Sequence, residues 1–290
     1  MRVAIVPEYE NSAVGILMRQ LCEEVKRQGI DATLTDRNVS LDYLDDNFDI
    51  AHFGWVDLFP PGHYNTLTIP ITLNVWGPAL DITMRLAARL RTLDPARVVV
   101  DDVYTLQVLG QLGIHEYEYI PLAFNHDLKP LPEPEGPFTV GVFGNEYRSK
   151  RFEIVEAACS HLPDVSYYPC IQDPDRTLYH LDPVRDVYRH IHVYAHASII
   201  DTNSMPAREA LFCGRPVIAT RNDGLMRIIR HGENGMFFDG TVNDLVRKIK
   251  IVKSCYGGMK YEADRTYPET TVQEAANDYI AMWQTAVGEY

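Results

Sequence analysis

The stretch that most constrains the fold spans residues 199–240, IIDTNSMPAREALFCGRPVIATRNDGLMRIIRHGENGMFFDG. An apolar segment over 192–200 predicts a strand, and an irregular polar loop follows it. Pro206 suits the start of a helix, because its restricted φ matches the first turn and its missing N–H is not needed there. The helix expected over 207–212 ends at a Cys-Gly pair, and the apolar segment 216–220 predicts a second strand. The stretch therefore indicates a βαβ unit.

The loop before this helix is expected to bind an anion. A strand followed by a short loop and a helix places the helix N-terminus at the carboxyl edge of a parallel sheet, where open α/β sheets bind ligands. The exposed N–H groups and the helix dipole favour negative charge there. Asp201 and Glu209 flank the loop, and carboxylates at such a place suggest hydrogen bonds from hydroxyl groups of a ribose or a hexose. On spacing alone, the simpler interpretation is favoured, in which Asp201 is a loop or cap residue and Glu209 a solvated helix residue.

The same stretch resembles the donor-binding half of GT-B glycosyltransferases of the retaining family 4 type, the glycosyl transferases group 1. That family carries the pattern E-G-F-G-x-P-x-x-E-A-x-A-x-G-x-P-V-I-A-T, then a G-G-x-x-E turn and a D-G-x-N-G tail. The positions that match are Pro206, Glu209, Ala210, Gly214, Pro216, Val217, Ile218, Ala219, Thr220, Gly224, Ile229, Gly232, Asn234 and Gly235.

Four positions depart from this pattern. Asp201 stands where the family has its first Glu, so the carboxylate is kept on a side chain one methylene shorter. Thr202 and Ser204 replace the two glycines, and Arg227 reverses the charge of the Glu in the turn. These departures bear on the identity of the donor sugar.

Length, charge and cysteine content set the broad class. A chain of 290 residues is long enough for two domains, and none of its apolar runs approaches the roughly 20 residues of a membrane span. The N-terminus lacks the pattern of a signal peptide, and the five scattered cysteines indicate reduced thiols and no zinc site, so we expect a cytoplasmic protein. The net charge of −13 disfavours nucleic acid and anionic lipid as partners.

The first half of the chain predicts a doubly wound α/β sheet, because strands and helices alternate along it. The expected strands are 2–7, 31–35, 49–53, 69–75, 97–100 and 117–121, the expected helices are 13–28, 80–93 and 104–112, and 42–46 is expected to be an acidic turn. Trp76 stands where the family has a histidine close to the transferred sugar, and its indole could stack on a sugar or base ring.

A proline-rich segment separates the two halves. Four prolines fall within residues 129–137, which predicts a stiff, non-helical linker. We therefore expect an N-terminal Rossmann-like acceptor-side domain over 1–130 and a C-terminal Rossmann-like nucleotide-sugar-binding domain over 137–271. The resemblance implies that a last helix over 272–290 crosses back to the first domain, and that the two domains face a cleft, as in GT-B enzymes.

The second half opens on a strand over 138–143 that ends at Gly144, followed by a basic segment. The family has V-G-R-x-x-x-x-K-G here, and its Arg and Lys hold the donor diphosphate. Lys150 matches the Lys, whereas Arg148 or Arg151 would supply the second cation. A cation at this place would stabilise the charge that develops on a leaving diphosphate. Without the resemblance, a solvated basic turn is the simpler interpretation.

The resemblance implies a glycosyltransferase that moves a sugar from a nucleotide-diphosphate sugar, such as a UDP-sugar, with retention and without a metal or other cofactor. The residues expected to be catalytic are Asp201, Lys150 and Glu209, those expected to bind the donor are Gly144, Arg148, Lys150, Asn203, Ser204, Met205 and Glu209, and those expected on the acceptor side are Glu8, Asn11, His52, Trp55 and Trp76. The acceptor, whether a small molecule, a glycan, a lipid or a modified nucleic acid, is left open.

Three other interpretations remain open. The first is the same chemistry on a modified DNA base, against which the net charge counts. The second is a GT-B-like protein without activity that binds a nucleotide or a partner, and the third is another doubly wound enzyme such as an epimerase. A nicotinamide enzyme is disfavoured because no G-x-G-x-x-G follows the first strand. His196 is interpreted as a packing or loop residue.

Overall fold

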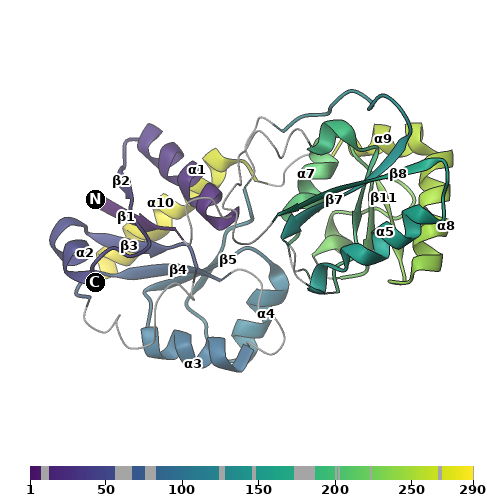
Figure 1. Ribbon diagram of the computed structural model, residues 1–290. Coiled ribbons are helices and arrows are strands. Elements are labelled where there is room, and N and C mark those ends of the chain that lie inside the picture. The colour runs from purple at the N-terminus through teal and green to yellow at the C-terminus, as the bar shows by residue number, and fades with distance from the viewer. Residues whose placement is uncertain are drawn as a thin grey trace. The chain divides into compact units, whose positions relative to one another are not determined.

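The computed structural model describes residues 1–7, 13–55, 67–75, 83–123, 128–145, 148–172, 187–199, 201, 203–222, 224–266 and 270–289. The chain divides into two compact units (Figure 1). Unit 1 consists of Met1–Asn125 together with Glu269–Tyr290, and unit 2 consists of His126–Pro268. Each unit is built on its own parallel sheet.

Unit 1 holds a six-stranded parallel sheet in the order β2-β1-β3-β4-β5-β6. The strands are β1 (Arg2–Val6), β2 (Asp31–Leu34), β3 (Ile50–Phe53), β4 (Ile71–Val75), β5 (Arg97–Val100) and β6 (Tyr117–Tyr119), and the helices are α1 (Ala13–Arg27), α2 (Leu41–Asn47), α3 (Thr83–Leu93), α4 (Val103–Gln111) and α10 (Val272–Glu289). Alternate residues of β1 enter two different cores, one under α1 and α10 and one on the opposite face. Both faces of the sheet are therefore covered, as a doubly wound fold requires.

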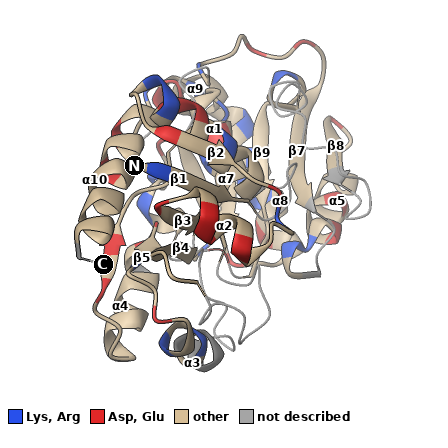
Figure 2. Cartoon of the chain, turned by 90° about the vertical axis from the view of Figure 1, so that its left-hand side faces the viewer, with Lys and Arg blue, Asp and Glu red and all other residues tan. Residues whose placement is uncertain are grey.

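The acidic turn expected over 42–46 is wrong, because this segment lies within helix α2. Ser40 caps the helix, and its side-chain oxygen accepts a hydrogen bond of 3.3 Å from the backbone N–H of Tyr43. A serine at this position satisfies one of the orphan N–H groups of the first turn. The positions of the acidic residues along α2 are coloured red on the cartoon in Figure 2.

Helix α10 is part of unit 1 and packs against α1 and the sheet. Its buried face carries Tyr279, Met282 and Trp283, all within the core that also holds Val3. The Tyr279 hydroxyl donates a hydrogen bond of 3.1 Å to the side-chain oxygen of Asn74 at the end of β4. The last helix of the chain thus completes the core that the first strand begins.

Unit 2 holds a five-stranded parallel sheet in the order β11-β10-β9-β7-β8. The strands are β7 (Phe138–Asn145), β8 (Val165–Gln172), β9 (Val193–His196), β10 (Val217–Thr220) and β11 (Gly235–Phe238). The helical segments are η2 (Arg148–Lys150), α5 (Phe152–Ser160), α7 (Met205–Phe212), η3 (Leu225–Arg227), α8 (Val242–Ser254) and α9 (Tyr256–Ala263). The strand order runs in opposite directions on the two sides of β7 and β9, so the switch point of this sheet lies between these two strands.

The proline-rich segment packs on unit 2. The backbone N–H of Leu131 donates to the carbonyl of Cys213 at 3.1 Å. The fully buried Arg215 donates through Nη2 to the carbonyl of Pro132 at 2.6 Å and through Nε to the carbonyl of Tyr188 at 2.6 Å. Compact packing of unit 2 therefore begins before the end of the proline-rich segment.

Candidate functional site

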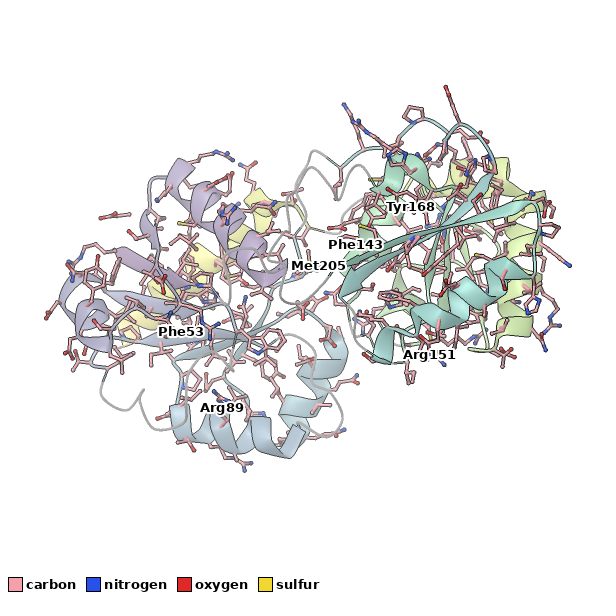
Figure 3. All side chains as sticks on the ribbon, viewed as in Figure 1. Phe53, Arg89, Phe143, Arg151, Tyr168 and Met205 are labelled. Atoms are coloured by element: carbon pink, nitrogen blue, oxygen red, sulfur yellow. The ribbon has the colours of Figure 1, made fainter. Side chains whose placement is uncertain are left out.

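The predicted donor-binding residues gather at the carboxyl end of β7 and β9 in unit 2. Gly144, at the end of β7, has a φ of +140°, a backbone conformation that favours glycine. Phe143 near the end of β7 and Met205 at the start of α7 are labelled at the same end of this sheet in Figure 3. The residues after β7 and the residues after β9 meet there, since the backbone N–H of Ile199 donates to the carbonyl of Ser149 at 3.1 Å. This is the edge of a parallel sheet at which ligands bind.

Lys150 and Asp201 form an ion pair across the switch point. The Lys150 Nζ lies 3.1 Å from Asp201 Oδ2, and the two side chains are 25% and 12% exposed. His196, the last residue of β9, brings its Nε2 within 3.0 Å of the same Asp201 oxygen. The structure therefore joins two residues predicted to be catalytic and adds a third side chain that the sequence did not assign to the site.

The Asp201 carboxyl is ionised in this setting. Burial alone would raise its pKa, but the neighbouring His196 and Lys150 outweigh burial and hold the pKa well below the ordinary value of 3.8. A buried carboxylate held by two basic neighbours keeps the capacity to accept hydrogen bonds from further donors. It is suited to hold hydroxyl groups.

Helix α7 begins beside this cluster. Ser204 is its N-cap, and the Ser204 Oγ accepts a hydrogen bond of 3.4 Å from the backbone N–H of Ala207. Pro206 stands in the first turn, as the sequence predicts. Asn203 precedes the cap and accepts through its Oδ1 a hydrogen bond of 2.6 Å from Arg208 Nε. The loop from Asn203 to Met205 thus leads directly into the positive end of the α7 dipole.

Glu209 lies inside unit 2 and is only 9% exposed, so the solvated alternative for this residue is wrong. The Tyr188 hydroxyl lies 3.0 Å from Glu209 Oε2 and 2.9 Å from the carbonyl oxygen of Pro206. Burial raises the pKa of Glu209 to about 7, although the hydrogen bond with Tyr188 acts in the opposite direction. A carboxyl that titrates near neutrality can take up or release a proton when a ligand arrives.

The two candidate cations beside Lys150 differ in position. Arg148 begins η2, and its side chain lies outside the described part of the structure. Arg151 has a φ of +49° and donates through Nε to the carbonyl of Ala197 at 2.8 Å. Arg151 therefore ties the segment after β7 to the segment after β9, and Figure 3 labels it beside α5.

The predicted acceptor-side residues belong to unit 1. Glu8, Asn11 and Trp76 lie outside the described residues. Trp55 follows β3 and is partly buried. His52 is fully buried, its Nδ1 lies 2.9 Å from Thr72 Oγ1, and burial lowers its pKa to about 3. The structure thus places the His52 side chain in the core.

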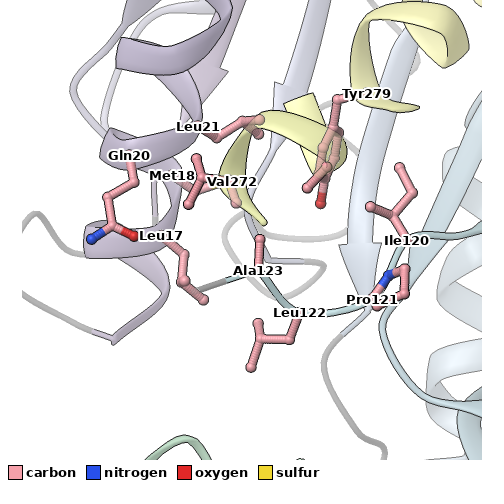
Figure 4. A pocket seen from close by; sticks show the side chains of 11 residues that line it. Leu17, Met18, Gln20, Leu21, Ile120, Pro121, Leu122, Ala123, Val272 and Tyr279 are labelled. Atoms are coloured by element: carbon pink, nitrogen blue, oxygen red, sulfur yellow. The ribbon is translucent and has the colours of Figure 1, made fainter. Parts of the chain in front are cut away.

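A pocket in unit 1 opens between α1, residues 120–123 and the start of α10 (Figure 4). Its empty volume is about 380 Å³ when the open solvent at its mouth is included, and its lining side chains are apolar apart from Gln20 and the hydroxyl of Tyr279. None of the predicted site residues lines this pocket.

Comparisons with known proteins bear on both the fold and the site. Residues 171–252 match the model of the family described as "Glycosyl transferases group 1". A D-inositol 3-phosphate glycosyltransferase of Rhodococcus jostii (strain RHA1) is 31% identical over 182 residues, which cover 59% of this chain and 37% of that protein. The chain therefore spans little more than a third of the length of this relative.

Two solved structures are similar to this chain over nearly its full length. Anabaena HepE in complex with UDP-glucose has a TM-score of 0.72 at 11% identity, with 100% of this chain and 99% of that chain covered. Sucrose-phosphate synthase from Thermosynechococcus elongatus has a TM-score of 0.73 at 14% identity, with 99% of each chain covered. The expected fold class, two Rossmann-like α/β domains of the GT-B type, is confirmed by these likenesses.

The family match covers Asp201 and Glu209 but not Gly144 or Lys150. The Lys150 side chain lies outside the matched segment in sequence and contacts Asp201 only because of the tertiary structure. Within the described ranges, no three His, Cys, Asp or Glu side chains are grouped so as to hold a metal ion. No helix in the described part of the chain is long and apolar enough to cross a membrane.

Proposed function

We propose that this chain is a glycosyltransferase that takes its sugar from a nucleotide-diphosphate sugar, and that unit 2 binds this donor. One observation carries the proposal. At the switch point of the unit-2 sheet, Lys150 and the Asp201 carboxylate meet beside the N-terminus of α7, the helix on which the buried Glu209 lies. A cation, a helix N-terminus and two carboxyl groups suit a ligand that has both phosphates and hydroxyl groups. The match of residues 171–252 to the glycosyl transferases group 1 supports the same function.

Each group has a distinct role in this proposal. Lys150, with Arg148, holds the diphosphate and stabilises the charge that gathers on it as the bond between the sugar and the phosphate breaks. Asp201 accepts hydrogen bonds from sugar hydroxyl groups, and the backbone N–H groups from Asn203 to Met205 reach the sugar oxygens. Gly144 lets the backbone approach the phosphates because it has no side chain.

Glu209 binds the ribose hydroxyl groups as a carboxylate. Its pKa of about 7 means that a substantial fraction is protonated near neutrality before the donor binds. Two ribose hydroxyl groups donate best to the ionised form, so donor binding would favour loss of that proton. The Tyr188 hydroxyl stabilises the carboxylate by donating to Oε2.

We further propose that transfer retains the configuration of the sugar and requires no metal or other cofactor. The bond from the anomeric carbon to the phosphate oxygen breaks, the acceptor oxygen bonds to the same face of that carbon, and the acceptor proton goes to the leaving phosphate. Lys150 supplies positive charge beside the leaving group in this scheme. The acceptor binds to unit 1, and the net charge of −13 makes a nucleic acid the least favoured of the candidate acceptors.

The test is donor binding and turnover. The purified chain is titrated calorimetrically with UDP-, GDP-, ADP- and TDP-sugars, and slow release of free sugar is followed with each. We expect one nucleotide to bind, and Lys150→Ala and Glu209→Gln each to weaken that binding about tenfold or more, because a hydrogen bond with a charged partner contributes about 1.5–3 kcal/mol.

Lys253→Ala is the matched control. Lys253 also pairs with an aspartate, since its Nζ lies 2.5 Å from Asp164 Oδ2, but the pair joins the last turn of α8 to the start of β8. This variant is expected to bind the donor as the wild type does. Absence of binding by all four nucleotide sugars would overturn the proposal in favour of a binding protein for another ligand, and equal losses in Lys150→Ala and Lys253→Ala would remove Lys150 from the site.

A further inference from the structure

His196 has polar neighbours at both ring nitrogens although it is only 3% exposed. Its Nδ1 lies 3.2 Å from the Tyr194 hydroxyl and 3.5 Å from Ser204 Oγ. Its Nε2 lies 3.0 Å from Asp201 Oδ2. The ring therefore connects the N-cap of α7 to the carboxylate that the proposed function assigns to the sugar.

The hydrogen-bonding capacity of these neighbours sets where the ring carries its proton. The ionised Asp201 carboxylate can only accept a hydrogen bond, so Nε2 must be the protonated nitrogen on that side. Ser204 Oγ already accepts from the backbone N–H of Ala207, and its own proton is free to point at Nδ1. The proton on Nε2 therefore points toward Asp201, on the side of the ring away from Ser204.

The contacts of Asp201 are concentrated on one oxygen. Lys150 Nζ and His196 Nε2 both approach Oδ2, and none of the described residues supplies a partner to Oδ1. The contact with Nε2 is close but does not have the geometry of a hydrogen bond. In the proposed function Lys150 engages the diphosphate, which would leave His196 as the partner of Oδ2.

We propose that His196 is a positioning residue that holds Oδ2 of Asp201 from the interior of unit 2. Oδ1 of Asp201 then faces a hydroxyl group of the donor sugar, and Lys150 engages the diphosphate. This inference rests on the proposed function and deepens it, because it assigns the sugar half of the donor to a chain of side chains running from Ser204 through His196 to Asp201. The nucleotide half depends on Lys150 and Glu209 and does not require His196.

His192 is the control for a buried histidine whose role is packing alone. It precedes β9, is 4% exposed, and accepts through Nδ1 a hydrogen bond of 3.1 Å from the backbone N–H of Thr139. It lies at the amino end of the strand whose carboxyl end carries His196. A leucine at position 192 therefore removes a buried histidine from the same strand region without touching Asp201.

The experiment compares His196→Leu, His196→Gln and His192→Leu in the full chain. Glutamine is chosen because its amide N–H can reach toward Asp201, whereas leucine cannot donate. For each variant we would measure the affinity for the free nucleoside diphosphate and for the matching nucleotide sugar, kcat for sugar release, and the titration of the Asp201 carboxyl carbon by NMR, assigned with Asp201→Asn.

We expect His196→Leu to bind the free nucleoside diphosphate within about threefold of the wild type, to lose about tenfold or more in kcat, and to lose the extra affinity that the sugar contributes. In the same variant the pKa of Asp201 should rise, because one of the two neighbours that lower it is gone. His196→Gln should recover most of kcat and of the low pKa, and His192→Leu should leave both unchanged.

The inference is overturned if folded His196→Leu keeps the wild-type titration of Asp201, or if leucine and glutamine reduce kcat equally. It is also overturned if His192→Leu causes the same loss, since the effect would then come from general loosening of the strand. Failure of the proposed function has a different signature: the wild type itself would bind none of the nucleotide sugars.

Discussion

Replacing Glu209 by glutamine should remove a pH-dependent loss of stability from unit 2. Glu209 is 9% exposed, and burial raises its pKa to about 7 from 4.5, the value expected in the unfolded chain. Between pH 4.5 and 7 the unfolded chain binds fewer protons at this group than the folded chain does. The free energy of unfolding therefore falls as the pH rises through this window. Glutamine has a similar size and stays neutral, so it does not incur this loss.

The magnitude follows from the two pKa values. At 1.36 kcal/mol for each unit of pKa difference, the complete effect is about 3 kcal/mol, and about 2.5 kcal/mol of it falls between pH 5 and pH 8. The hydrogen bond from Tyr188 is included in this figure, since it acts on the same pKa. A difference of this size is a large part of the stability of a typical domain.

Urea unfolding at pH 5 and pH 8 measures the effect, and the tryptophans separate the two units. Trp55, Trp76 and Trp283 are the three tryptophans of the chain, and all belong to unit 1. Tryptophan fluorescence therefore follows unit 1, whereas far-UV circular dichroism follows both units. We expect the wild-type transition of unit 2 to lose about 2.5 kcal/mol more than that of Glu209→Gln between the two pH values.

Glu233→Gln is the control for this prediction. Glu233 also lies in unit 2, but its side chain is 58% exposed and it pairs with Arg230. This variant should reproduce the pH dependence of the wild type. If the wild type and Glu209→Gln lose the same stability between pH 5 and pH 8, the reasoning from burial is refuted.

Three further predictions concern the packing of the chain. Burial lowers the pKa of His52 to about 3 from 6.5, so between these pH values the folded unit 1 binds fewer protons than the unfolded chain. The free energy of unfolding of unit 1 should therefore fall by about 1.4 kcal/mol per pH unit as the pH drops through that window. His52→Gln should reduce this pH dependence, as measured by tryptophan fluorescence during urea unfolding. Gly214→Ala should destabilise unit 2 by about 2 kcal/mol or more in urea unfolding, because φ is +71° and the new Cβ would lie 1.9 Å from Asp264 Oδ1. Adding Asp264→Ala should recover the part of the loss that is due to the clash. The backbone strain of about 1 kcal/mol should remain. Tyr279→Phe should lower the free energy of unfolding of unit 1 by about 1 kcal/mol, because it removes the hydrogen bond to Asn74. Tryptophan fluorescence during urea unfolding measures this change, and an unchanged transition would show that the bond makes no net contribution.

Local features of the sequence predicted local structure well. The alternation of apolar segments indicated two parallel α/β sheets, and Pro206 marked the start of α7 because proline suits a first helical turn. Helix α2 was missed for a local reason as well, since an acidic surface helix of seven residues has little apolar periodicity and depends on the Ser40 cap. The family pattern singled out Asp201 and Glu209 without showing what surrounds them.

The surroundings were decided by the tertiary structure. Lys150 and Asp201 are 51 residues apart in the chain and meet because β7 and β9 are neighbours at the switch point of the sheet. Tyr188 reaches Glu209 across 21 residues, and burial of that pair moves the pKa of Glu209 toward neutrality. His196 had no motif to distinguish it, and only its place at the end of β9 brings it to Asp201. Periodicity reports which face of an element is apolar, whereas the strand order determines which polar groups come together, and that order depends on contacts between residues far apart in the chain.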